Sequence, residues 1–363
     1  MVLTQERPAT SQQTQRGVID CDIHPALASP TSLNPYLSAE WQAHHDTIGG
    51  FSVAGGYYPR MNPNAARHDA WPPSGLPPGA DLEFMQQQLL DAWNIEFGVL
   101  QPLLGAGAQR NLDYGTAMSH AVNEWLVNEW LLPEKRLRAG LVVPYEDGDL
   151  AAAEIHRMGD QPGFVQVMLV IRTAEPLGRR KYWKMYQAAV EHDLPIGIHF
   201  GGAGGGPITG TGWPSFYVED HAGMPTSFEG QLISLVCEGV FEEFPDLKVV
   251  LIEGGFAWVP SLAWRLDAAW KKLKAEVPRL KRLPSEYIHD HVWLTTQPME
   301  EPARPEQFVE LLESFPLADR LMFSTDYPHW DFDAPDQALP KITLGDGVEE
   351  AIMSENARAL YRL

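Results

Sequence analysis

Short apolar runs alternate along the chain with longer segments in which apolar residues recur at helical spacing. The short runs are rich in β-branched residues, which is typical of strands buried in a parallel sheet. In one of the longer segments, residues 227–244, Leu232, Leu235, Val236 and Val240 share one helix face. We predict eight strands, at residues 17–24, 96–103, 137–145, 164–171, 195–200, 248–255, 291–296 and 320–326. Repeated βα units of this number indicate an α/β fold, a closed (β/α)8 TIM-like barrel.

Two long segments interrupt this alternation, and each follows a predicted strand, the first and the fifth. Residues 26–80 are rich in Gly and Pro with aromatic residues between them, as in FSVAGGYYPRMNPN, and residues 201–226 form the second segment. Loops of this length in a compact domain are usually binding loops or lids. Disordered linkers are the alternative, although disordered segments are poor in Trp and Tyr. We expect one barrel domain over residues 17–363, with these two segments as lid or insertion loops and residues 1–16 as a flexible arm.

Composition and charge narrow the class of partner. The chain of 363 residues has a formal net charge of −21, so nucleic acid and anionic membrane surfaces would be repelled. Cys21 and Cys237 are too few for a disulfide framework or a Cys-rich metal site. The polar opening lacks the apolar core of a signal peptide, and no apolar run approaches the ~20 residues of a membrane span. These features predict a cytoplasmic protein that acts on a small molecule.

Polar side chains interrupt the apolar runs where the predicted strands end. In VIDCDIHP, residues 18–25, the alternating Asp20, Asp22 and His24 share one strand face. The other strand ends carry Arg172, His199, Glu253, Asp326 and, shortly after it, His329. In a barrel these ends meet at one mouth, where two imidazoles and two carboxylates would suit Zn²⁺ or Mn²⁺. Taken singly, each has a structural explanation: a satisfied core histidine, a turn at Asp326, or a strand-end hydrogen-bond acceptor at Asp20, which we do not count as a ligand.

Five motifs resemble the aminocarboxymuconate-semialdehyde-decarboxylase-like branch of the amidohydrolase superfamily: VIDCDIHP, PIGIHFGG, KVVLIEGGFAWVP, LMFSTDYPHWD and IMSENARALYRL. The resemblance runs from about Gly17 to the end of the chain. It implies a distorted barrel of the metal-dependent hydrolase type, a dimer or larger homo-oligomer, and one divalent metal ion, first Zn²⁺ and alternatively Mn²⁺. Carried over by position, the ligands are Asp22, His24, His199 and Asp326.

The chain departs from the family pattern at two positions, one of which is a ligand position. Asp22 stands where the family commonly has His, although an acid also occurs there in related decarboxylases. Glu253 stands where family members usually have a catalytic His. It either takes over as acid or base, or it is a buried carboxylate tied to a loop backbone.

Further roles follow for the residues at the predicted mouth. Asp326 would orient a metal-bound water and accept its proton, and His329 is a candidate acid for the leaving group. Arg172 would bind a substrate carboxylate or form a salt bridge at the surface. Four aromatic residues would pack on an aromatic or cyclic substrate or within a lid: Trp213, Phe216, Tyr217 and Trp330.

Two reactions compete for this site. Metal-activated water would hydrolyse an amide, ester, lactone or C–C bond, whereas a decarboxylase would release CO₂ from an aromatic or enoic acid without oxidation. The resemblance favours decarboxylation. Glu253 favours hydrolysis, because a second anion beside a substrate carboxylate costs on the order of several kcal/mol unless Arg172 or the metal offsets it. We favour hydrolysis; a catalytically silent binding protein is a third interpretation.

Overall fold

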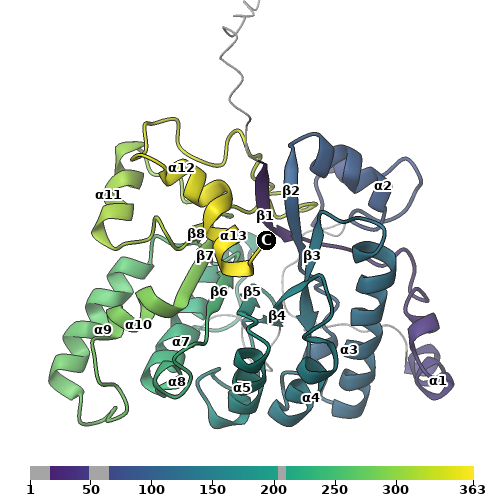
Figure 1. The fold of residues 1–363 in the computed structure, drawn as a ribbon, viewed down its shortest axis with the longest axis horizontal. Helices are drawn as coiled ribbons and strands as arrows, with labels where there is room; N and C mark the ends of the chain where they lie inside the picture. The colour runs from purple at the N-terminus through teal and green to yellow at the C-terminus, as the bar shows by residue number, and fades with distance from the viewer. Residues whose placement is uncertain (1–16, 49–64, 203–209) are drawn as a thin grey trace, which may run out of the picture.

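The computed structural model describes residues 17–48, 65–202 and 210–363, and its centre is a ring of parallel strands (Figure 1). Eight strands lie side by side in sequence order. They are β1 Val18–Ile23, β2 Ile95–Leu100, β3 Leu137–Val142, β4 Phe164–Val170, β5 Ile196–His199, β6 Val249–Ile252, β7 Val292–Thr295 and β8 Leu321–Met322. Every one of them overlaps a predicted strand, so the predicted (β/α)8 barrel is confirmed.

The ring closes between β1 and the segment that follows the short strand β8. The Cys21 amide donates to the Phe323 carbonyl at 3.0 Å, and the His24 amide donates to the Tyr327 carbonyl at 2.7 Å. Between them, the Asp326 amide donates to the Asp22 carbonyl at 3.1 Å. This seam joins the beginning of the barrel to its end and sets the polar residues of the two segments side by side.

Helices surround the strands on the outside of the barrel (Figure 1). They are α1 Ala39–Ile48, α2 Leu82–Met85, α3 Leu112–Leu126, α4 Gly148–Met158, α5 Trp183–Glu191, α6 Tyr217–Ala222, α7 Met224–Cys237, α8 Val240–Glu243, α9 Val259–Leu273, α10 Pro284–His291, α11 Glu306–Ser314, α12 Val348–Glu350 and α13 Asn356–Tyr361. Shorter helical turns are η1 Asn34–Tyr36, η2 His68–Ala70, η3 Gln86–Asp91, η4 Ala106–Ala108, η5 Val127–Leu131, η6 Arg180–Tyr182 and η7 Ala351–Glu355. Capping residues fix where two of the helices begin. The side chains of Asn111 and Asp147 accept hydrogen bonds from backbone amides in the first turns of α3 and α4.

The C-terminal helix α13 closes one end of the barrel. Its residues Leu360 and Tyr361 pack in one apolar cluster with side chains from strands that face each other across the ring, such as Val99 of β2 and Val250 of β6. The Tyr361 hydroxyl donates to the Gln166 side chain of β4 at 2.8 Å. Because several of these residues lie early in their strands, the covered end is the amino-terminal one. The carboxyl ends of the strands are left for the site.

Parts of both predicted insertions are helical rather than irregular. Within 26–80 the structure contains η1, α1 and η2, and within 201–226 it contains α6 and the beginning of α7. The stretch FSVAGGYYPRMNPN, residues 203–209 and the predicted arm 1–16 lie outside the described residues. The role of the two insertions as lids stays a prediction.

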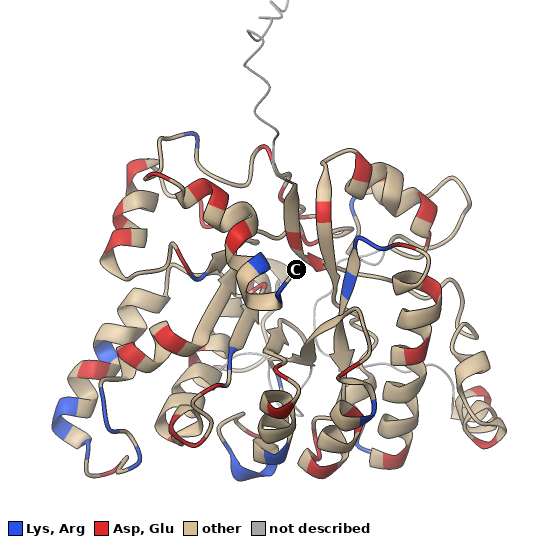
Figure 2. Cartoon of the chain, viewed as in Figure 1, with Lys and Arg blue, Asp and Glu red and all other residues tan. Residues whose placement is uncertain are grey.

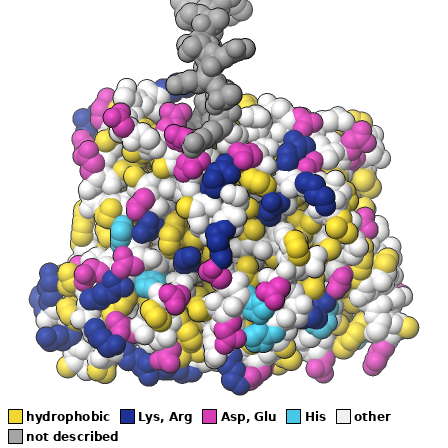
Figure 3. Space-filling model, viewed as in Figure 1, with side chains coloured by type: hydrophobic (Ala, Val, Ile, Leu, Met, Phe, Trp, Pro, Cys, Tyr) yellow, Lys and Arg dark blue, Asp and Glu magenta, His cyan; other side chains and the backbone are white. Residues whose placement is uncertain are grey.

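Acidic side chains are spread over the outer helices, with Lys and Arg between them (Figure 2). On the face shown in Figure 3, acidic, basic and hydrophobic side chains are intermixed. Within the described ranges, no helix combines the length and the apolarity that crossing a bilayer requires.

Candidate active site

Four predicted ligands converge at the carboxyl ends of the strands. Asp22, His24, His199 and Asp326 are all buried, and each offers a ligand atom within 4.8 Å of the others. We call these four residues the inner cluster. His24 Nε2 lies 2.7 Å from Asp326 Oδ1 and 3.3 Å from Asp22 Oδ1, while His199 Nε2 lies 3.3 Å from Asp22 Oδ2. Residues separated by some 300 positions in the chain thus meet in one buried space.

Backbone carbonyls fix both imidazoles of the inner cluster. The Nδ1 atom of His24 lies 2.9 Å from the Gln101 carbonyl oxygen, and that of His199 lies 2.6 Å from the Phe200 carbonyl oxygen. A carbonyl can only accept, so each Nδ1 carries the proton and each Nε2 points at the carboxylates. This orientation is typical of metal-binding histidines.

The polar atoms of the inner cluster fit a divalent cation. Among the described residues, neither carboxylate oxygen of Asp22 has a hydrogen-bond partner, and neither does His199 Nε2. Leaving buried charged or polar groups unpaired is costly. Two imidazole nitrogens and two carboxylates form a donor set suited to Zn²⁺ or Mn²⁺. The unpaired atoms and the donor set together support the predicted metal site.

Asp20 holds the two ends of the seam together beneath this cluster. Its Oδ1 accepts the amides of Asp22 at 3.1 Å and Thr325 at 3.0 Å, and its Oδ2 accepts the Thr325 hydroxyl at 2.6 Å. Burial raises the pKa of this carboxyl to about 7, although the hydrogen bonds oppose the shift. Asp20 is therefore a hydrogen-bond acceptor that positions its neighbours, as expected, but it lies within β1 rather than at its end.

Two non-glycine residues at the mouth adopt left-handed backbone conformations. Glu253, directly after β6, has φ of +60°, and Asp326, after β8, has φ of +62°. Such conformations are uncommon outside glycine and cluster at functional sites, where the surrounding structure holds them in place. Here the Glu253 amide donates to the Thr295 hydroxyl at 3.0 Å, and the Asp326 amide is held in the seam.

His329 lies against the inner cluster. Its ring stacks on that of His24 with centroids 4.4 Å apart, and its Nδ1 lies 2.7 Å from Asp326 Oδ1. Burial alone would lower the pKa of His329, but the charge of Asp326, the hydrogen bond to it and the charges of Asp331 and Asp22 together outweigh burial and raise this pKa to about 9. Burial would raise the pKa of Asp326, whereas the charge of His329 and the hydrogen bonds from His24 and His329 bring it well below its ordinary value. The two form a charged, hydrogen-bonded pair.

Glu253 lies at the edge of the inner cluster. Its Oε2 is 3.5 Å from His199 Nε2. Burial, followed by the charges of Asp326 and Asp22, raises the pKa of Glu253 well above its ordinary value. The side chain is thus close enough to act in the site.

Arg172 is engaged by another residue of the chain. Its Nη2 lies 2.6 Å from Asp220 Oδ1, and its guanidinium stacks over the Phe200 ring at 4.5 Å. Both side chains of the ion pair are largely buried, so this is not a surface salt bridge. A substrate carboxylate would have to share Arg172 with Asp220.

The four predicted aromatic residues separate into two groups. Tyr217 and Trp330 pack together with ring centroids 6.3 Å apart, and Trp330 also contacts His221 at 5.2 Å. Trp213 is 40% exposed, Trp330 is 43% exposed and Phe216 is 67% exposed. The structure therefore brings Tyr217 and Trp330 together, although Trp330 is about as exposed as Trp213.

Two further polar residues beside the inner cluster, His221 and Asp331, were not predicted from the sequence. His221 of α6 and Asp331, after β8, approach Glu253, and each of the three offers a ligand atom within 4.8 Å of the others. We call His221, Glu253 and Asp331 the outer cluster. Asp331 ends the motif LMFSTDYPHWD, and His221 lies in the second predicted insertion. The sequence did contain a signal for these two residues: an acid and an imidazole lie in two segments that were both predicted to be at the mouth of the barrel.

Comparison with known proteins identifies the family. The amidohydrolase family model matches residues 19–363. The chain belongs to the amidohydrolase family. This confirms both the resemblance carried by the five motifs and the prediction of an enzyme of that superfamily.

Individual relatives agree with this family assignment. A gamma-resorcylate decarboxylase of Polaromonas sp. strain JS666 is 26% identical over 302 residues, which are 78% of this chain and 88% of the relative. An amidohydrolase from Mycobacterium avium subsp. paratuberculosis K-10 shares the fold with a TM-score of 0.73 at 20% identity, over 96% of this chain and 99% of that one. A 5-carboxyvanillate decarboxylase from Novosphingobium aromaticivorans, solved with manganese and 3-methoxy-4-hydroxy-5-nitrobenzoic acid, gives 0.72 at 18% identity, over 98% and 99%.

The names of these relatives bear on the choice between the two reactions. They do not support hydrolysis, which the sequence analysis favoured, and they favour its alternative, decarboxylation. Glu253 was expected to disfavour a substrate carboxylate unless Arg172 or a metal ion offset its charge, and in the structure Glu253 lies 3.5 Å from His199 of the inner cluster.

Proposed function

We propose that this amidohydrolase-family member is a metal-dependent, non-oxidative decarboxylase of a small aromatic acid. The observation that carries the proposal is the inner cluster, two imidazoles and two buried carboxylates at the mouth of a barrel whose sequence relatives include gamma-resorcylate decarboxylases. The reaction converts an aryl carboxylate and a proton into the arene and CO₂.

The four residues of the inner cluster would hold the metal ion. When bound, a divalent cation in this position offsets the negative charge of an acidic substrate and orients it. We infer Mn²⁺ rather than Zn²⁺, which the sequence analysis placed first, because half of the ligands are carboxylates and because the solved 5-carboxyvanillate decarboxylase contains manganese. Metal analysis of protein purified without chelators or added metal tests this choice.

The pair of His329 and Asp326 would supply the proton. The two side chains are hydrogen-bonded at 2.7 Å, and against the effect of burial the charge of Asp326 helps to raise the pKa of His329. A protonated imidazole at the mouth can deliver a proton to the ring carbon that loses CO₂ and then regain one from water. Tyr217 and Trp330 lie where an aromatic ring could pack.

The test compares the two reactions directly. Metal-loaded protein is incubated with gamma-resorcylate, 5-carboxyvanillate and other aromatic acids, and separately with lactones and aryl esters. Decarboxylation predicts CO₂ release and, in D₂O, one deuterium on the product ring carbon. His329→Asn should lower kcat by about 10²- to 10⁴-fold, the usual contribution of a general acid. Hydrolysis of a lactone or ester with no CO₂ from any acid would refute the proposal.

Hydrolysis stays the second candidate because of Glu253. A carboxylate 3.5 Å from His199 Nε2 is close enough to accept a proton from water bound at the centre. Glu253→Gln would then abolish ester or lactone turnover, and a protein in which neither Glu253→Gln nor His329→Asn alters any turnover would need a different assignment. The homo-oligomer and the cytoplasmic location stay predictions.

A further inference from the structure

The outer cluster has the composition and geometry of a second metal site. Its three side chains come from separate elements: His221 from α6, Glu253 from the end of β6 and Asp331 from the segment after β8. His221 Nε2 lies 2.7 Å from Asp331 Oδ2, and all three offer ligand atoms within 4.8 Å of one another. The inner cluster has the same signature, a His Nε2 atom 2.7 Å from an Asp oxygen with further ligands in reach.

Gln297 gives an independent indication that a ligand is bound here. Its Nε2 donates to Asp331 Oδ2 at 2.9 Å and lies 3.4 Å from Asp326 Oδ2, so this one amide spans the two clusters. The side chain is fully buried, and its Oε1 has no hydrogen-bond partner among the described residues. A buried amide oxygen without a hydrogen-bond partner, on a side chain whose nitrogen contacts both clusters, is a polar atom whose burial a ligand bound here would offset.

The placement of carboxylates at the mouth also favours a second cation. The two clusters bring together four carboxylates, those of Asp22, Asp326, Glu253 and Asp331. Asp22 and Asp326 belong to the inner cluster, whereas Glu253 and Asp331 lie with His221 in the outer cluster, and Arg172 is engaged with Asp220. Carboxylates brought together in a largely buried space repel one another unless a cation lies between them.

We propose that His221, Glu253 and Asp331 bind a second divalent cation, giving the chain a two-metal centre. Imidazole and carboxylate ligands suit Mn²⁺ or Zn²⁺. The second ion would also fasten α6 to the barrel, because His221 is its ligand from that helix. The proposal holds for either reaction, so its failure and that of the proposed decarboxylase activity are distinguishable.

The test counts metal ions in the purified full chain. Protein stripped with a chelator is titrated with Mn²⁺ and freed of loose metal by gel filtration, and bound manganese is measured by mass spectrometry. We expect two equivalents for the wild type and one for both His221→Ala and Asp331→Asn. Electron paramagnetic resonance should show a spin-coupled Mn²⁺ pair in the wild type and an isolated ion in these variants. Circular dichroism checks that each variant is folded.

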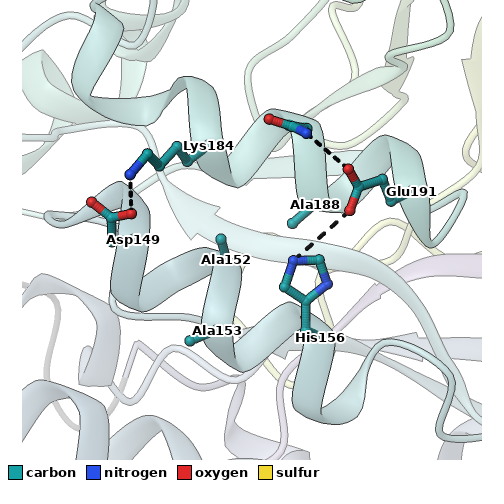
Figure 4. Close-up of a pocket in the computed structure, with 8 residues that line it drawn as sticks. Asp149, Ala152, Ala153, His156, Lys184, Ala188 and Glu191 are labelled. Carbon is teal, nitrogen blue, oxygen red and sulfur yellow. Dashed lines mark hydrogen bonds and ion pairs between the residues drawn. The ribbon is translucent and has the colours of Figure 1, made fainter.

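A surface histidine pair provides the matched control. Nδ1 of His156, in α4, lies 3.1 Å from Nε2 of His192. His156 also lines a surface pocket together with Glu191 (Figure 4). His156→Ala should leave two equivalents bound. Saturation of the wild type at one equivalent would overturn the proposal. So would two equivalents in both outer-cluster variants, or the loss of one in His156→Ala, because either result places the second ion elsewhere.

Discussion

At the scale of single residues, Asp22 is the side chain whose charge most clearly requires a cation. It is fully buried, and neither carboxylate oxygen has a hydrogen-bond partner among the described residues. Asp22→Asn should therefore leave the metal-free protein at least as stable as metal-free wild type, because a buried charge is removed. The variant should also lose the stabilisation by metal, which for the wild type is about 2.7 kcal/mol when the free metal is at 100 times Kd.

Thermal melting with and without Mn²⁺ measures both effects. Asp149→Asn is a suitable control, since this exposed carboxylate pairs with Lys184 at the surface. It should keep the full rise in Tm on adding Mn²⁺. A wild-type rise in the Asp22→Asn variant would mean that Asp22 is not a ligand.

The same scale shows why the sequence predicted one cluster and not the other. His24, His199 and Asp326 each end an apolar run, and a polar residue at that place is conspicuous. His221 and Asp331 do not follow apolar runs of this kind. They come close together only because of the path that α6 takes. For Arg172 the sequence left a substrate carboxylate and a surface salt bridge open, because the position of Asp220 depends on that same path.

At the scale of secondary-structure elements, Glu134 fastens the segment between η5 and β3. Its carboxylate accepts hydrogen bonds from the Arg136 guanidinium at 2.7 Å and from Gln86 of η3 at 2.8 Å. The hydrogen bonds from Arg136 lower the pKa of Glu134 to about 2, although burial opposes the shift. Because the folded pKa lies below the unfolded one, the charged carboxylate stabilises the fold at neutral pH. This contribution is lost as the pH falls from about 4.5 toward 2.

Glu134→Gln should accordingly lower the free energy of unfolding by about 1.5–3 kcal/mol at pH 7, the range for hydrogen bonds to a charged group. The difference from wild type should shrink at pH 4 and shrink further at pH 3. Urea unfolding at the three pH values measures it. Glu175→Gln, at an exposed ion pair with Lys181, should change stability little at any of them. A difference that is independent of pH would contradict the assignment.

The C-terminal helix α13 is expected to stabilise the fold without taking part in the chemistry of the site. Leu360 is buried in the apolar cluster at the amino-terminal end of the barrel, opposite the metal ligands. Leu360→Ala should cost about 2–5 kcal/mol in the free energy of unfolding, the range for a large buried aliphatic residue. Bound manganese per chain should not change. Urea unfolding and metal analysis test the two parts, and a loss of metal without a loss of stability would show that α13 acts on the site itself.

Elements were predictable from the sequence to different degrees. The strands of a barrel are buried on both sides, so most of their residues are apolar, although β1 contains Asp20 and Asp22. Helix α1 lies within the first predicted insertion and has the sequence AEWQAHHDTI, in which His45 is the only buried residue. A helix that buries so little has no clear apolar face, and so the sequence alone indicated a loop there.

At the scale of the whole molecule, three of the four proposed metal ligands lie where the barrel closes. Asp22 comes from β1, His24 directly follows it and Asp326 lies in the segment after β8, while His199 comes from β5 on the other side of the ring. Neighbouring strands elsewhere pair along ladders, whereas the seam is held by the amides of Cys21, His24 and Asp326. A cation bound by all four ligands would therefore link the two sides of the seam and tie them to β5.

Metal removal should consequently loosen the seam more than the rest of the barrel. If bound metal stabilises the closed seam by about 2.7 kcal/mol, chelation should speed hydrogen exchange of the Cys21, His24 and Asp326 amides about 100-fold, since 1.4 kcal/mol corresponds to tenfold. Amides of β3 and β4, which pair along a ladder with one register shift at Ala139 and Gly140, should change much less. Hydrogen exchange followed by mass spectrometry, with Mn²⁺ and after chelation, separates the regions. An equal change in β3 and β4 would mean that the metal stabilises the fold as a whole, and no change at the seam would place the ion away from β1 and β8.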